Sequence, residues 1–235
     1  MTVSILIPFR DPENGRRTVV LQWLLKKWAV EYPEAEVIVE GDDGKNPFCK
    51  SMAVNRAVCR ATGDILVITD ADVWLQPNVI REAATRGQAW VTKRQKIGLS
   101  KADTDALLRI DPLRWRGVAT DQERERAEWH SRLKTSPPIM FTRVTYTAVN
   151  GMDERFRGWG GEDRAFGLAL ETIVGPATSE FTEDAVHLFH PRFRVQGKNA
   201  WVGQKEPYLA RQLSGKYSRT VNNKAEMLKL VEGNR

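Results

Sequence analysis

The sequence is poor in cysteine, with only Cys49 and Cys59 among its 235 residues. These two thiols match no zinc-ligand spacing and no disulfide framework, which excludes a disulfide-stapled domain and a cysteine-based zinc module. We expect both to be small residues packed in the core. The sequence also lacks any apolar run of about 18 residues, so no transmembrane segment is predicted.

Features of a targeting signal are absent from the first residues as well. Residues 1–10 hold a short apolar stretch, but no basic leader and no cleavage site. We therefore expect a cytoplasmic protein. With 41% hydrophobic and 28% charged residues, the composition is that of an ordinary globular domain that needs no disulfide or structural metal.

The net charge of +6 is concentrated near the end of the chain. Residues 192–235 contain ten Lys and Arg but three Glu, so the rest of the chain is close to neutral. Such a basic segment can attract an anionic acceptor, a nucleic acid or an acidic membrane surface. A solvated helical tail is the plainer interpretation of residues 193–235.

Strand and helix patterns alternate in the first part of the chain. Near-continuous apolar runs at 3–7, 36–39 and 64–69 predict buried strands, and apolar periodicity at 18–30 and 51–61 predicts the helices between them. This β-α-β-α-β order predicts an α/β fold with an open, mostly parallel sheet flanked by helices. Ligands bind such sheets at the carboxyl ends of the strands, and all three predicted strands end in polar residues.

The pattern is weaker in the remaining part. Strands are predicted at 89–92, 139–142 and 185–189, and a helix at 162–170. Residues 101–134 are polar and helical in character, and no chemical role follows from them.

Two carboxylates, Asp70 and Asp72, stand at the end of the third predicted strand. In an extended segment, residues two apart point to the same face, so these carboxylates would meet and need a cation between them. Oxygen ligands of this kind suit Mg²⁺ or Mn²⁺, which can bridge the oxygens of a diphosphate.

A glycine-rich loop, Gly158-Trp159-Gly160-Gly161-Glu162-Asp163, precedes the helix predicted at 162–170. Glycines let the backbone approach a ligand closely, and the Trp159 indole can form a platform for a sugar ring. Glu162 and Asp163 would open the helix, where carboxylates are favoured by the helix dipole. The alternative is a structural loop with a core tryptophan and two capping acids.

Two of the three histidines, His187 and His190, lie near the end of the last predicted strand. A histidine pair at a strand end suggests a metal site. Residues three apart in a regular strand face opposite sides, so we expect only one ligand, preferably His187, unless the strand breaks before Pro191.

Further motifs complete an ordered set. They are Pro8-Phe9-Arg10, Gly41-Asp42-Asp43-Gly44, Lys50 with Asn55-Arg56, and the stretch 150–156 that runs into the glycine-rich loop. Together with the Asp-x-Asp triplet, this set resembles the GT-A glycosyltransferases. More narrowly, it is similar to family 2 enzymes whose later part is like the C-terminal region of β-1,4-galactosyltransferases. The resemblance covers residues 3–80 and 138–192, and the 97–137 insert has no counterpart.

The resemblance implies a role for each motif. A nucleotide-sugar donor, by resemblance a UDP-sugar, would be bound by Pro8, Phe9, Arg10, Asp42, Asp43, Lys50, Asn55, Arg56 and Asp70. The acceptor would be held by Trp159, Gly160, Gly161 and Glu162, with Asp163 as the general base. A Mn²⁺ or Mg²⁺ ion would be bound by Asp72 with His187 or His190. The family's pattern at this point is Met-x-x-His, whereas this chain has His-x-x-His.

The predicted function is therefore an inverting, metal-dependent glycosyltransferase acting on a saccharide or protein acceptor. Residues 1–192 would form one catalytic domain, with a nucleotide-sugar half at 1–80 and an acceptor and metal half at 138–192. Three alternatives remain open at this point: the same chemistry on a modified base of a nucleic acid, a non-catalytic nucleotide-sugar-binding module, and a nucleotidyltransferase.

Overall fold

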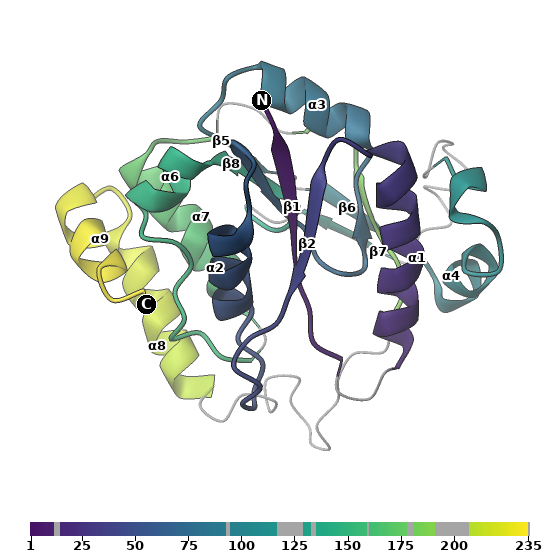
Figure 1. The fold of residues 1–235 in the computed structure, drawn as a ribbon. Coiled ribbons are helices and arrows are strands. Elements are labelled where there is room, and N and C mark those ends of the chain that lie inside the picture. The colour runs from purple at the N-terminus through teal and green to yellow at the C-terminus, as the bar shows by residue number, and fades with distance from the viewer. Residues whose placement is uncertain are drawn as a thin grey trace.

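The computed structural model describes residues 1–11, 15–92, 95–116, 129–132, 135–158, 160–177, 181–190 and 207–234, with backbone alone at 95, 129–132 and 207–208. Its central sheet has five strands in the order β2-β1-β3-β8-β5 (Figure 1). They are β1 (Val3–Pro8), β2 (Glu36–Glu40), β3 (Ile65–Ile68), β5 (Trp90–Thr92) and β8 (Ile139–Thr142). β1 runs parallel to both β2 and β3, and β8 joins β3 and β5 in antiparallel pairs.

A second, smaller sheet has the order β4-β9-β6-β7. Its strands are β4 (Val73–Trp74), β6 (Gln95–Gly98), β7 (Trp129–Arg132) and β9 (Ala185–His187). β7 lies in the 101–134 segment that we expected to be helical, and this part of the prediction is wrong. Among the described residues of this segment, the helix α4 (Lys101–Leu107) and the 3₁₀ turn η1 (Pro112–Arg114) are helical. Pairing with β6 overrides the polar helical pattern at 129–132.

Helices cover both faces of the central sheet because successive strand residues point to opposite sides. Ile5 and Ile7 of β1 pack in one apolar cluster with α1 (Arg16–Glu31) and α3 (Pro77–Thr85). Leu6 packs in the other cluster, with α2 (Lys50–Arg60) and α7 (Glu162–Ile173). α1 and α2 accordingly lie on opposite sides of β1 in Figure 1. The short α6 (Arg143–Ala148) follows β8.

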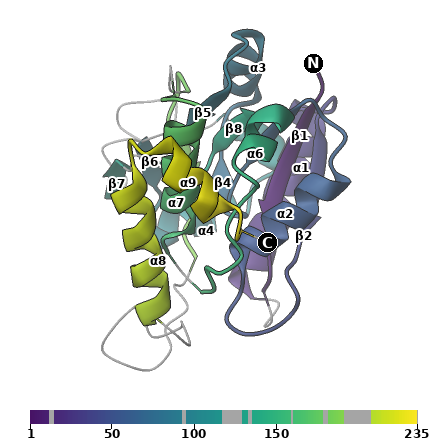
Figure 2. The same cartoon turned by 90° about the vertical axis from the view of Figure 1, so that its left-hand side faces the viewer.

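The basic tail is part of the second apolar cluster. Its helices α8 (Pro207–Thr220) and α9 (Lys224–Val231) both contact α7, as Figure 2 shows. Leu213, Tyr217 and Met227 are buried there. The Tyr217 hydroxyl lies 3.0 Å from Asp153 Oδ2 and 2.8 Å from Asn234 Oδ1. The interpretation of a solvated tail is therefore wrong for residues 207–234, because apolar side chains of both helices face the core.

The two cysteines differ in their surroundings. Cys49 is buried as expected, and burial raises the pKa of its thiol to about 11. Cys59 is exposed on α2, so the expectation of a packed residue is wrong for this one. Among the helices of the described residues, none is long and apolar enough to span a membrane.

Because α9 belongs to the core, we expect truncation of a buried side chain on it to destabilise the whole chain. Met227 is fully buried, and Met227→Ala should lower the free energy of unfolding by about 2–5 kcal/mol. Leu228→Ala removes an apolar side chain from the same helix at a position that is 39% exposed, and should cost under about 0.5–1 kcal/mol. Equilibrium urea unfolding measures both. Equal, small losses would show that α9 is not packed as described.

Candidate active site

The carboxyl ends of β1, β2 and β3 meet at one edge of the central sheet, because these strands are parallel. β1 ends at Pro8, and the Phe9 amide still donates to the Glu40 carbonyl at 2.9 Å. Arg10 follows and pairs with Asp42 beyond β2, with 3.1 Å between Nη1 and Oδ1. The structure thus brings together the predicted Pro-Phe-Arg and Asp-Asp-Gly motifs.

Asp43, the next residue, forms a forked salt bridge with Arg157. Its two carboxylate oxygens lie 3.1 and 2.8 Å from the guanidinium nitrogens. Hydrogen bonding to this guanidinium holds the pKa of Asp43 well below its usual range. Arg157 was not predicted, and its only sequence signal is a basic residue directly before the glycine-rich loop. The pair ties that loop to the end of β2.

The predicted donor residue Asn55 lies within a buried polar network. It is 5% exposed, and its Nδ2 donates to the Met152 carbonyl at 2.9 Å and to Glu154 at 2.8 Å. Its Oδ1 accepts from the Met152 amide at 3.0 Å and from the Tyr146 hydroxyl. These bonds join α2 to the loop that follows α6. A donor contact of Asn55 stays a prediction.

Arg56, on the same helix, donates to the backbone carbonyl of Asp42. This hydrogen bond therefore ties α2 to the loop after β2. Its predicted contact with the donor also stays a prediction.

The Asp70-Ala71-Asp72 triplet forms a turn, closed by a hydrogen bond from the Val73 amide to the Asp70 carbonyl at 3.1 Å. The expectation that both carboxylates share one face is wrong, because the segment is not extended. Asp70 Oδ1 accepts from Lys50 at 2.8 Å, and Oδ2 lies 3.4 Å from Lys96 Nζ. Burial raises the pKa of Asp70, but these two ammonium groups outweigh it and hold that pKa below its ordinary value. Lys96 was not predicted.

Asp72 points instead to the histidines. Its Oδ2 lies 3.1 Å from His190 Nε2, and its Oδ1 lies 3.5 Å from His187 Nε2. β4 and β9 bring them together, since the Leu188 amide donates to the Asp72 carbonyl at 2.8 Å. β9 ends at His187, so the chain turns and His190 reaches the same side. Both histidines therefore lie beside Asp72, because the strand breaks before Pro191, and which of them binds a metal stays a prediction.

These three residues fit a divalent cation. Their ligand atoms lie within 4.8 Å of one another. Asp72 is 2% exposed, and its Oδ2 accepts no hydrogen bond from any described residue. Burial lowers the pKa of His187, which favours the neutral imidazole that a metal requires. The carboxylate suits Mn²⁺ and the two imidazoles suit first-row transition metals in general, so the set fits a divalent transition-metal ion. Arg17, which the sequence did not indicate, lies 3.2 Å from Asp72 Oδ2.

Asp163 and Glu162 open α7 beside this edge. The preceding Gly161 has a φ of +98°, and a Cβ there would lie 3.0 Å from the Phe156 ring, so the turn requires glycine. Lys50 Nζ donates to Asp163 Oδ2 at 3.0 Å as well as to Asp70. Burial disfavours the ammonium, but the Asp163 and Asp70 carboxylates outweigh it and hold the pKa of Lys50 above its usual range.

Both acids of α7 are biased toward their protonated forms. Burial, and then the charge of Asp163, raises the pKa of Glu162 to about 7. Burial also raises the pKa of Asp163, although Lys50 opposes the shift. Glu162 Oε2 is buried and accepts no hydrogen bond within the described part of the chain, whereas both Asp163 oxygens lie 3.0 Å from Lys50 Nζ. Such carboxylates are suited to exchange protons with a substrate near neutral pH.

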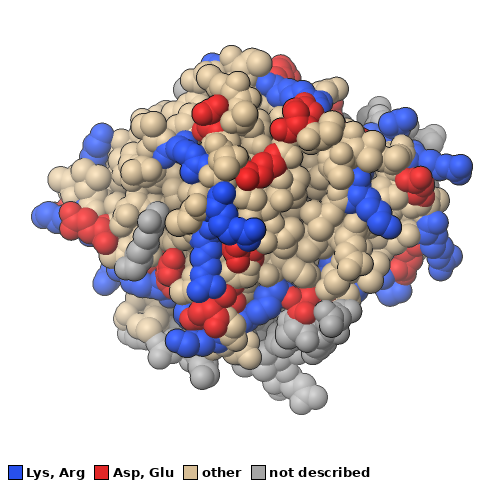
Figure 3. Space-filling model, in the orientation of Figure 1, with Lys and Arg blue, Asp and Glu red and all other residues tan. Residues whose placement is uncertain are grey.

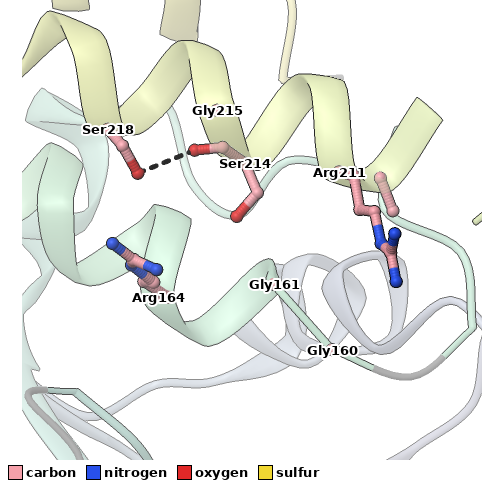
Figure 4. A pocket seen from close by; sticks show the side chains of 8 residues that line it. Gly160, Gly161, Arg164, Arg211, Ser214, Gly215 and Ser218 are labelled. Carbon is pink, nitrogen blue, oxygen red and sulfur yellow. Dashed lines mark hydrogen bonds between the residues drawn. The ribbon is translucent and has the colours of Figure 1, made fainter. Parts of the chain in front are cut away.

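The structure describes only part of the predicted acceptor loop. Trp159 lies outside the described residues. Gly160 and Gly161 line a cavity of about 260 Å³ between the start of α7 and α8 (Figure 4). No sequence pattern indicated that α8 would form the other wall of this cavity.

The later part of the chain matches a family model. The model is described as the N-terminal domain of galactosyltransferase and matches residues 128–173, a stretch that contains both acids of α7. A search of curated proteins finds no match to the chain.

Solved structures match over most of the chain. The catalytic domain of Drosophila β1,4-galactosyltransferase 7 in complex with xylobiose is 14% identical, with a TM-score of 0.51, covering 92% of this chain and 80% of that one. A mutant of the same enzyme with manganese, UDP-Gal and xylobiose is 14% identical, with a TM-score of 0.55, covering 89% and 79%. Residues 1–349 of TarS from S. aureus with UDP-GlcNAc are 13% identical, with a TM-score of 0.53, covering 99% and 71%.

The chain has the GT-A fold. This confirms the predicted fold class, an α/β fold with an open, mostly parallel sheet flanked by helices. The family-model match and the structural neighbours together support the predicted enzyme class, a glycosyltransferase.

The cluster of Asp72, His187 and His190 predicts that Mn²⁺ stabilises the protein. At a Mn²⁺ concentration about 100 times the dissociation constant, the stabilisation is about 2.7 kcal/mol, or a rise in Tm of several degrees. Asp72→Ala should abolish the rise. Glu183→Ala, which removes an exposed carboxylate just before β9, should keep it. Thermal unfolding with and without Mn²⁺ tests this, and an undiminished rise in the Asp72 variant would exclude Asp72 as a ligand.

The raised pKa of Glu162 predicts a pH-dependent stability. The folded state binds a proton at Glu162 up to about pH 7, whereas the unfolded chain releases it near the ordinary value of 4.5. Stability should therefore fall as pH rises through this window. Glu162→Gln should flatten this fall and be more stable than the wild type at pH 8, by on the order of 1–3 kcal/mol.

Glu171→Gln, at an exposed site of the same helix, is the matched control for Glu162→Gln. Its stability should stay parallel to that of the wild type between pH 4.5 and pH 8, as measured by urea unfolding. A Glu162 variant that follows the wild-type pH dependence would contradict the assignment of the proton to this carboxyl group.

Proposed function

We propose that this chain is an inverting glycosyltransferase that moves a sugar from a UDP-sugar to a saccharide hydroxyl, with Mn²⁺ or Mg²⁺ as cofactor. The main support is the position of Lys50, which joins Asp70 at the end of β3 to Asp163 at the start of α7. This contact places a buried acid of the acceptor side next to the strand edge where the donor motifs meet.

The donor side rests on the loops after β1 and β2. Arg10, Asp42 and Asp43 lie there and are held by ion pairs to one another or to Arg157. Structures of the neighbouring proteins hold UDP-Gal with manganese in one case and UDP-GlcNAc in another. Both ligands are UDP-sugars, which supports a UDP-sugar as the donor of this chain.

Asp72, His187 and His190 would hold the cation. When bound, the cation supplies positive charge close to the departing diphosphate. Arg17 and Lys96 add fixed positive charge at the same edge, since each lies beside one carboxylate of the Asp-x-Asp turn. This density of cationic groups is suited to an anionic leaving group.

Asp163 acts as the general base in this proposal. Lys50 orients its carboxylate, because the ammonium Nζ lies 3.0 Å from each of the two carboxylate oxygens. The acceptor oxygen attacks the anomeric carbon and transfers its proton to Asp163. The bond between that carbon and the diphosphate oxygen breaks, and the diphosphate keeps the electron pair. One such displacement inverts the anomeric centre through an oxocarbenium-like transition state.

The acceptor side would comprise Trp159, Gly160, Gly161 and Glu162. The Drosophila structures hold xylobiose, which supports a saccharide acceptor here. On the face of the molecule drawn in Figure 3, the coloured Lys and Arg side chains alternate with Asp and Glu. The described residues of that face therefore form no extended basic surface of the kind that duplex nucleic acid requires.

Replacement of the proposed base tests the mechanism. Asp163→Asn removes the proton acceptor but keeps the shape of the side chain, so turnover should fall by about 10²–10⁴. Binding of UDP with Mn²⁺, measured by calorimetry, should stay within a few-fold of the wild type. Glu171→Gln, farther along the same helix, should leave both quantities unchanged.

Normal turnover by the Asp163→Asn variant would reject the assignment of the base. Failure of the wild type to release UDP from any UDP-sugar, with or without saccharide acceptors, would reject the transferase proposal in favour of a binding module. Release of pyrophosphate instead of UDP would identify a nucleotidyltransferase.

A further inference from the structure

The cavity between α7 and α8 joins the glycine-rich loop to the basic tail. Gly160 and Gly161 form its floor, and residues 210–218 of α8 form the opposite wall. Figure 4 shows Ser214 and Arg211 pointing from α8 toward the Gly160–Gly161 turn, and Arg164 pointing from α7 toward α8. A segment with no assigned role thus faces the proposed acceptor loop.

The lining of this cavity is cationic. It contains Arg164 and Arg211 but no carboxylate. α8 carries Arg211, Lys216 and Arg219, and its sequence has no Asp or Glu. Arg219 also approaches the cavity, since a Cβ on the lining residue Gly215 would lie 3.2 Å from its Nη1. Arg164 forms no salt bridge with any described residue.

Neither Glu162 nor Asp163 lines this cavity. Gly161 and Arg164 are three residues apart and therefore share one side of α7. Asp163 lies on another side and bonds to Lys50. The cavity thus lies next to the proposed base along the chain, but Asp163 itself does not line it.

We infer that the acceptor is an anionic saccharide, whose phosphate, sulfate or carboxylate group lies between Arg164 and Arg211 while a hydroxyl of the adjoining unit meets Asp163. This inference rests on the proposed transferase function. Guanidinium groups bind such anions through paired, charge-assisted hydrogen bonds, and the Ser214 hydroxyl adds a neutral partner.

The size of the cavity favours a saccharide over a nucleic acid. Its volume of about 260 Å³ accommodates one sugar-sized unit with its anionic group. A nucleic acid needs a long basic track along its backbone. The arginines here line one small, solvent-open cavity instead, Arg164 from α7 and Arg211 from α8 (Figure 4).

Binding measurements on the protein loaded with Mn²⁺ and UDP test the inference. The probes are glucose 6-phosphate, glucose 6-sulfate and glucuronate, each compared with glucose at the same ionic strength by calorimetry. The anionic sugars should bind at least tenfold more tightly than glucose. Which of the three binds most tightly identifies the anionic group.

Substitutions locate the binding. Arg164→Gln and Arg211→Gln should each weaken binding of the preferred anionic sugar about tenfold, which corresponds to the loss of one charge-assisted contact. The double variant should bind it no better than glucose. Lys216→Gln removes the same charge from an exposed position of α8 outside the cavity lining, and should change binding less than twofold.

Three results would overturn the inference. The first is equal affinity for glucose and the anionic sugars, and the second is an equal loss of affinity in the Lys216 variant. The third is binding of a single strand of about 20 nucleotides that the arginine variants lose while their sugar binding is unaffected. UDP release from the UDP-sugar without acceptor is measured in parallel. Its absence in the wild type would reject the transferase proposal, whereas its presence with any of the three results rejects only the anionic acceptor.

Discussion

The site depends on the buried bridge that Lys50 forms between Asp70 and Asp163. Without this ammonium, two buried carboxylates would face each other across the sheet edge at a large electrostatic cost. Lys50 is the first residue of α2, so the rigid α2 helix sets the position of both acids. This one interaction therefore fixes the position of the proposed donor side relative to the proposed acceptor side.

Contacts between distant segments support this bridge. Arg157 ties the glycine-rich loop to Asp43, and Asn55 ties α2 to the loop that carries Met152. β4 and β9 pair so that His187 and His190 reach Asp72. Each contact joins the first eighty residues to the segment after β8. The catalytic arrangement is thus a property of the junction between the two halves and not of either half alone.

The strand and helix order of residues 3–69 was predictable, because buried parallel strands and amphipathic helices leave strong apolar patterns. The candidate residues of the strand ends were predictable for the same reason. The turn at Asp70 was not, since the Asp-x-Asp spacing is compatible with an extended or a turned backbone. The basic residues Arg17, Lys96 and Arg157, which pair with acids of the site, were not predicted. A single basic residue carries no local pattern that reveals an acidic partner far along the chain.

The sequence alone determined the fold class, the ordered motifs and the chemical nature of the proposed site, because these follow from local periodicity and residue type. Only the tertiary structure decided that both histidines meet Asp72 and that α8 lines a cavity together with Gly160 and Gly161. The basic tail shows the difference most clearly. Its charge was visible in the composition. Packing against α7 buries Leu213, Tyr217 and Met227, and this packing decides to which side the basic side chains point.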